Sequence, residues 1–124
     1  MTRYRAWESG LFFSIATSVM TTKAHISAGV CGLETSVVVR SQGSRCAIAI
    51  QSSCTFVQRL AEELVDVEPL SEILSRDELP RIWQLAAKHR LHAACPVPIG
   101  ILKAIEVEAG LALPADVSIT ISRE

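Results

Sequence analysis

The 124-residue sequence predicts an α+β fold, in which helices pack on one face of a three- to four-stranded, mainly antiparallel sheet. Two observations predict this class. Before Gln51, apolar residues alternate with the period of two that is typical of half-buried strands, and after Cys54 they follow the 3.6-residue helical period. The expected order of elements is βββααα(α)β, which contains no parallel βαβ unit.

Three strands are predicted in the first half of the domain. Apolar alternation over residues 24–30 indicates a first strand that ends at Cys31, and the β-branched run within residues 35–40 indicates a second. A turn signal over residues 41–44 precedes a third strand, in which apolar residues alternate over residues 46–50. We expect these strands to form an antiparallel meander with one buried face.

Helical spacing predicts helices after the third strand. The first helix follows Cys54, and Ser52 or Ser53 is a ready N-cap for it. A short helix is expected over residues 70–74, and a longer amphipathic segment covers residues 79–89.

The C-terminal part predicts one long helix and one strand. Pro96 and Pro98 give the chain a stiff entry into a helix over residues 99–109, and Gly110 is a typical C-cap. Apolar and polar residues then alternate over residues 117–121. We expect this last segment to return to the sheet as a fourth strand.

Composition describes a globular domain of ordinary size. Apolar residues make up 49% and charged residues 20% of the chain, and the formal net charge is −1. This charge gives no reason to expect nucleic acid as a partner. The apolar run over residues 11–20 is too short to span a bilayer and no cleavage signal follows it, so we expect no membrane and a cytoplasmic location.

The first nineteen residues differ from the rest in composition. They hold four of the six aromatic residues of the chain, and the residues from Met20 resemble an ordinary start of translation. We therefore expect residues 1–19 to be a flexible N-terminal extension, for instance from an upstream start codon, and residues 20–124 to be a single α+β domain. An anchor that lies on a membrane surface is the alternative.

Three cysteines stand where elements are predicted to begin or end. Cys31 ends the first strand, Cys54 and Cys95 precede helices, and His92 lies three residues before the last of them. Three thiols and an imidazole are soft ligands for a zinc ion or an iron–sulfur cluster. Cys46 instead alternates with the apolar residues of a strand and is expected in the core. The sequence predicts a metal site at Cys31, Cys54, Cys95 and His92.

Helix starts favour negative charge, so Cys54 and Cys95 are placed to become thiolates. A run of bases ahead of Cys95 predicts a cationic rim that would lower the pKa of that thiol. The alternative interpretation of this run is an ordinary solvated helix face. The bases and histidines concerned are Arg81, Lys88, His89, Arg90 and His92.

The cysteine pattern resembles the iron–sulfur scaffold proteins of the IscU/SufU/NifU type. It comprises Cys31-Gly32, a strand leading into SSC at Cys54, and HAAC at Cys95, with intervals of 23 and 41 residues that are close to the spacing in that family. The resemblance implies an IscU-like fold in which three cysteines and a histidine hold a zinc ion or a nascent cluster. It also implies a sulfur donor or an apo-protein acceptor as partner.

A second resemblance is to short, uncharacterised microbial proteins. It is carried by AGVCG at Cys31, SSC at Cys54, HAACPVP at Cys95 and KAIEVEAGLALP from Lys103. This resemblance supports the limits of the domain and implies no activity.

Other functions remain open at this point. A thiol-redox or persulfide-carrying protein would use Cys54 or Cys95 as the reactive thiol, with a second cysteine to resolve it. A non-enzymatic binding module with structural cysteines is the other alternative. Sequence signatures of hydrolases and nucleotide-binding enzymes are missing, so an enzyme is the less favoured class.

Overall fold

The computed structural model describes residues 21–124 and confirms the α+β class. Within these residues a sheet of four strands has the order β1-β2-β3-β4, and every neighbouring pair is antiparallel. The predicted extension over residues 1–19 lies outside the described part. The strands are β1 (Thr21–Ser27), β2 (Glu34–Gln42), β3 (Arg45–Ser52) and β4 (Asp66–Val67), and the helices are α3 (Thr55–Glu63), α4 (Pro69–Leu74), α5 (Arg81–Lys88) and α6 (Val97–Glu108).

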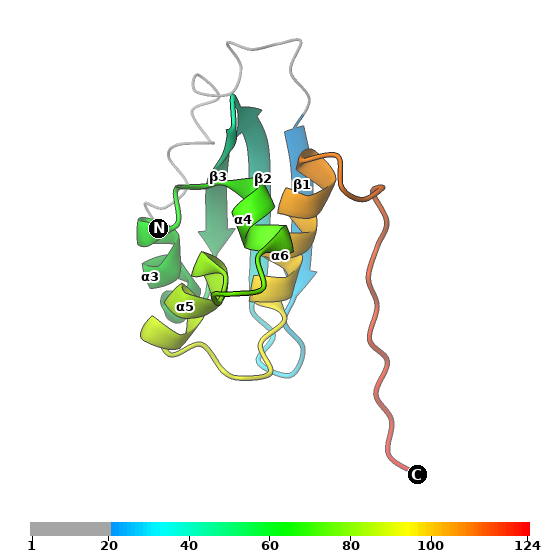
Figure 1. The fold of residues 1–124 in the computed structure, drawn as a ribbon. Coiled ribbons are helices and arrows are strands. Elements are labelled where there is room, and N and C mark those ends of the chain that lie inside the picture. The colour runs from blue at the N-terminus through cyan, green and yellow to red at the C-terminus, as the bar shows by residue number, and fades with distance from the viewer. Residues whose placement is uncertain (1–20) are drawn as a thin grey trace.

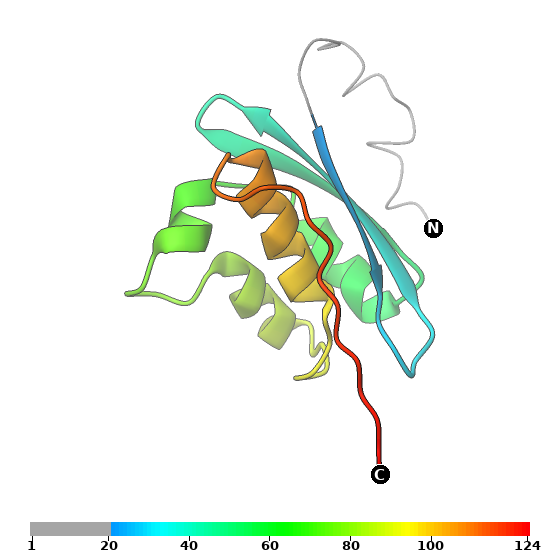
Figure 2. The same ribbon diagram turned by 90° about the vertical axis from the view of Figure 1, so that its right-hand side faces the viewer.

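The helices cover one face of the sheet, as Figures 1 and 2 show from two directions. The alternation of the strands explains this arrangement, because every second residue of β2 and β3 points to the helices. Val37 and Val39 of β2 are fully buried there, and Leu60 of α3 and Ile101 of α6 pack into the same apolar cluster. The predicted two-layer arrangement therefore has its core between the sheet and the helices.

Helix α6 lies unusually close to β1 because Gly100 has no side chain. A Cβ atom built at Gly100 would lie 2.4 Å from Cγ1 and 2.5 Å from Cδ1 of Ile26. The end of α6 is also tied to the sheet, since Glu108 accepts hydrogen bonds from the Thr22 hydroxyl at 2.7 Å and the Ser41 backbone N–H at 2.9 Å. These contacts fix the direction in which the chain leaves α6.

The predicted fourth strand over residues 117–121 is wrong. The fourth strand is β4, a two-residue segment that pairs with Cys46 and Ala47 of β3. Residues 113–124 have no regular secondary structure, and Ile119 and Ile121 are 72% and 87% exposed. Alternation gives a segment the side-chain pattern of a strand, but a strand also needs a neighbour for its backbone groups. Within residues 21–124, residues 117–121 have no such neighbour.

Candidate functional site

One cavity of about 110 Å³ brings the four predicted metal ligands together. Cys31, Cys54, His92 and Cys95 all line it, although they come from separate parts of the sequence. We call this cavity the thiol pocket. Its other lining residues are Ala28, Leu33, Thr35, Phe56, Val57, Leu91 and Val97.

Cys31 reaches the thiol pocket from the tight connection between β1 and β2. It lies beyond the end of β1, in a turn closed by a hydrogen bond of 2.9 Å from the Gly32 N–H to the Gly29 carbonyl. Gly29 and Gly32 have φ values of +99° and +73°, which L-residues with a side chain rarely adopt. Cys31 itself is exposed, so this thiol is the one most open to solvent and to other molecules.

Cys54 occupies the N-cap position of α3 and is half-buried. The expectation that Ser52 or Ser53 caps this helix is therefore wrong. The hydroxyl of Ser52 instead accepts a hydrogen bond from the Cys54 backbone N–H at 3.1 Å and shares another of 2.8 Å with Thr35. These bonds hold the start of α3 against β2 and set the position of Cys54.

His92 and Cys95 lie in the loop that joins α5 to α6. The loop begins at Arg90, whose φ of 61° is left-handed, and the Leu91 N–H then donates to the Ala86 carbonyl at 3.0 Å. This reversal ends α5 and places Leu91 against the core. The Cys95 N–H donates to the His92 carbonyl at 3.0 Å, which holds the two predicted ligands in one turn.

The pKa of the Cys95 thiol is raised, so the expected lowering by a cationic rim is wrong. Burial is the main cause, and negative charge on Cys54 or Cys31 would raise the pKa further, while the Val97 N–H lowers it. Two of the expected rim residues point elsewhere, because Lys88 and His89 both bind Glu63 on α3. Burial thus outweighs the helix start at this thiol.

The three thiols share a pocket without already forming a coordination sphere. Cys31, Cys54 and Cys95 all line this one cavity. Among residues 21–124, however, no group of three or more histidine, cysteine, aspartate or glutamate side chains is arranged to hold a metal ion. An ion would therefore require the side chains to come closer together. Cys31 lies on an exposed turn, and nothing lies within 4 Å of a Cβ built at its neighbouring glycines, Gly29 and Gly32.

Sequence reasoning missed the apolar wall of the thiol pocket. Leu33, Phe56 and Val97 line it, and each stands two positions after one of the three cysteines. This repeated Cys-x-apolar spacing is the signal that would have found them. The apolar wall surrounds Cys95 with side chains of low polarity, which fits the rise in the pKa of this thiol by burial.

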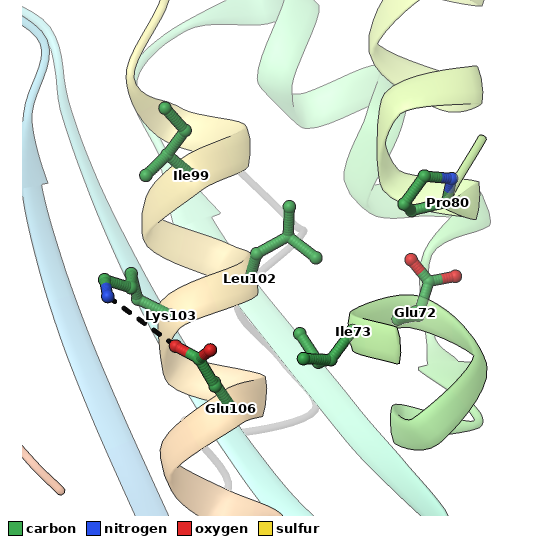
Figure 3. A pocket seen from close by; sticks show the side chains of 7 residues that line it. All are labelled: Glu72, Ile73, Pro80, Ile99, Leu102, Lys103 and Glu106. Carbon is green, nitrogen blue, oxygen red and sulfur yellow. Dashed lines mark ion pairs between the residues drawn. The ribbon is translucent and has the colours of Figure 1, made fainter. Parts of the chain in front are cut away.

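A larger cavity of about 320 Å³ lies between α4 and α6 (Figure 3). Its charged groups already have partners. Both carboxylate oxygens of Glu72 accept backbone hydrogen bonds at the start of α5, from Arg81 at 2.9 Å and Ile82 at 3.4 Å, and Lys103 pairs with Glu106 at 3.6 Å. We therefore regard this cavity as a weaker candidate for chemistry.

A polar cluster of His25, Glu34 and Ser36 lies on the face of the sheet that points away from the helices. It resembles a hydrolase triad only because a histidine contacts both a carboxylate and a serine hydroxyl. His25 contacts Glu34 through Nε2 and Ser36 through Nδ1, the latter at 3.3 Å. The side chains of His25 and Glu34 are 62% and 51% exposed, and both cavities described above are lined by other residues. Such a cluster offers no apolar enclosure in which a substrate would be held.

Comparison with known proteins places the chain in a family. No curated protein and no solved structure matches it. Within residues 21–124, no helix has the length and apolar character needed to cross a membrane. Residues 22–121 match a family described as a family of unknown function, DUF6951, and this match covers every element above except Thr21, the first residue of β1. The chain therefore belongs to the DUF6951 family.

Proposed function

We propose that the thiol pocket binds a thiophilic metal, as a zinc ion or an iron–sulfur cluster, and that the protein acts as a scaffold or carrier for it. The observation that carries this proposal is the convergence of Cys31, Cys54, Cys95 and His92 on one cavity. Three thiolates and one imidazole complete the four-ligand set that zinc prefers, and cysteine thiolates are the usual ligands of iron–sulfur clusters.

The raised pKa of Cys95 fits a site whose thiols lose their protons to a metal. Burial keeps this thiol neutral near pH 7, so it is a poor nucleophile on its own. A bound cation reverses the balance, because it compensates the charge of the thiolates, and binding then releases protons. The metal would thus stabilise the negative charge of the thiolates, which the apolar side chains around them cannot do.

The exposure of Cys31 favours a carrier role over a purely structural one. A structural metal site is closed, whereas this ligand lies on an exposed turn between two glycines with positive φ. An exposed ligand can be exchanged for a thiol of another protein. The partners that fit are a sulfur donor or an apo-protein acceptor, and a reducing cytoplasm would keep the thiols available.

The direct test is to purify the protein without oxygen and to measure metal, acid-labile sulfide and the visible spectrum. We expect about one zinc ion or one cluster per chain. Substitution of Cys31, Cys54 or Cys95 by serine should abolish binding, while His92→Ala should weaken it. Cys46→Ala is the matched control, because Cys46 is a buried thiol outside the pocket, and this variant should retain the metal.

Two outcomes would contradict the proposal. Metal-free protein that also fails to take up zinc or a reconstituted cluster would leave a binding module with structural cysteines. Stable persulfide or a disulfide between pocket cysteines, formed with no metal uptake, would favour the thiol-redox function instead.

A further inference from the structure

The C-terminal segment has the pattern of a strand but no partner strand in the part of the chain that the structure describes. Val117, Ile119 and Ile121 alternate with polar residues and are 57%, 72% and 87% exposed. The family match extends through residue 121, so this segment belongs to the domain shared by the family. We call residues 117–121 the tail segment. A β-branched apolar face of this kind is costly to leave in water.

The same chain has a sheet edge that lacks a neighbour. Within residues 21–124, β1 pairs with β2 on one side and with no strand on the other. β1 is seven residues long, enough to take the tail segment. Its helix-facing residues, Ala24 and Ile26, contact the apolar core. Lys23 and His25 alternate with them and form a polar row on the opposite face of the sheet. A strand added here would continue both rows.

The flank of α6 beside this edge is partly apolar. Gly100 of α6 contacts Ile26 of β1, and helical spacing places Lys103 and Val107 on the same side. Figure 3 shows the Lys103 side chain on the β1 side of the helix. Leu111, just after α6, is 41% exposed. The helix-facing side of an added strand would therefore bury its apolar residues against Val107, Leu111 and the aliphatic stem of Lys103.

We propose that the protein forms a dimer in which the tail segment of each copy adds as a strand to the outer edge of β1 in the other copy. The described part of each chain holds one such segment and one such edge. A reciprocal exchange gives each segment an edge to pair with and closes at two copies. The exchange also covers an edge that would otherwise invite aggregation.

The direction of the chain favours a second copy over the chain's own edge. Glu108 is bonded to Thr22, so the tail leaves α6 near the start of β1 and runs in the same general direction as β1 in both views (Figures 1 and 2). Pairing within one chain would therefore be parallel, the less stable arrangement. A twofold axis perpendicular to β1 reverses the direction of the partner's tail segment, which then pairs antiparallel with β1.

Sedimentation equilibrium of the full chain tests this proposal. We expect a dimer that becomes a monomer when the chain is ended after Pro114. Ile119→Asp should raise the dissociation constant at least tenfold, because it places a charge on the apolar side of the added strand. Thr120→Asp, which introduces the same charge on the polar side, should change it by less than threefold.

Amide hydrogen exchange of the dimer locates the contact. We expect protection of the amides of residues 117–121 and of the outward amides of β1, with both lost on dilution to the monomer. A full chain that stays monomeric at 100 µM, or a dimer that survives removal of the tail segment, would overturn the proposal. Protection of the tail segment without protection of β1, or in a monomer, would also overturn it.

Discussion

Among the four cysteines, burial separates Cys46 from the other three. Cys46 lies in β3 at 1% exposure, where burial and the negative charge of Glu108 raise its pKa and a Ser41 hydrogen bond lowers it. Cys31, Cys54 and Cys95 are at least partly exposed and share the thiol pocket. The cysteines thus have two kinds of environment. The sequence already indicated both, through the strand alternation around Cys46 and the predicted element ends at the other three cysteines.

Replacing Cys46 by serine should reduce stability without affecting the thiol pocket. The substitution puts a hydroxyl in the apolar core, and we expect a loss of about 1–3 kcal/mol in the free energy of unfolding. Urea denaturation measures this loss. An unchanged midpoint would show that Ser41 fully satisfies the new hydroxyl.

Gly100→Ala should destabilise the protein through contact with Ile26. The new Cβ would overlap the Ile26 side chain, and overpacking of this kind costs about 1–3 kcal/mol. In an Ile26→Ala background the overlap is gone, and the same change should be neutral or stabilising because alanine favours the helix. A double-mutant cycle by denaturation measures this coupling, and additive effects would contradict the close approach of α6 to β1.

Local sequence patterns predict most of the helices and strands of the domain, but they do not predict which strands pair with each other. The helices near residues 70–74, 79–89 and 99–109 were predictable from apolar spacing, and the structure places them at α4, α5 and α6. β4 could not be predicted, because two residues carry no periodicity and pair only through their position beside β3. The prediction of a strand at the tail segment was wrong for the opposite reason. Its pattern is clear, but a strand also needs a neighbouring strand, and none pairs with it within residues 21–124.

Contacts between elements also explain the error at Cys95. The sequence shows that Lys88 and His89 precede this cysteine, but it does not show that both turn toward Glu63 of α3. Charge runs report position along the chain, whereas a pKa depends on distance in space and on burial. The three pocket cysteines could be predicted from their places near element ends, and His92 from its closeness to Cys95 in the sequence. The electrostatics of the pocket could not be predicted in this way.

The ion pairs between α3 and α5 should make stability depend on pH. Hydrogen bonds from Lys88 and His89 lower the pKa of Glu63 below its ordinary value of 4.5. A lowered folded-state pKa means that the stabilisation is present above about pH 4.5 and is lost as the pH falls through the folded-state pKa. Glu63→Gln should therefore lower the midpoint of thermal unfolding at pH 7 and have a smaller effect at pH 3.

Asp77→Asn serves as the control for this pH dependence, because Asp77 is an exposed residue of the loop between α4 and α5. We expect similar unfolding midpoints for this variant and the unchanged protein at both pH values. An equal loss at pH 3 and pH 7 for Glu63→Gln would show that packing, rather than charge, accounts for its effect.

For the molecule as a whole, the sequence predicted the class and the layers because both follow from apolar periodicity. The sheet packs its helices on one side, and the strand ends and helix starts meet at the thiol pocket. What the sequence could not give is the final geometry of that pocket. Side chains from three segments, the β1–β2 connection, the start of α3 and the α5–α6 loop, approach one another there, and their distances depend on the packing of the complete core.

Deleting residues 1–19 should leave the stability of the domain nearly unchanged. This prediction depends on their distinct composition and on the family match, which begins only at residue 22. We expect a change below about 1–2 kcal/mol, the size expected for one buried side chain. Chemical denaturation of the two chains measures it, and a larger loss would mean that residues 1–19 contribute to the core.

X-ray absorption spectroscopy of the zinc-loaded protein tests the thiol pocket most directly, since it reports which atoms hold the ion. The account predicts three sulfur ligands at roughly 2.3 Å and one nitrogen ligand at roughly 2.0–2.1 Å. In His92→Ala, which should weaken binding without abolishing it, the nitrogen ligand should be lost from the bound zinc, while Cys46→Ala should keep all three sulfur ligands. A shell of nitrogen and oxygen atoms alone, or a nitrogen ligand that His92→Ala leaves unchanged, would contradict it.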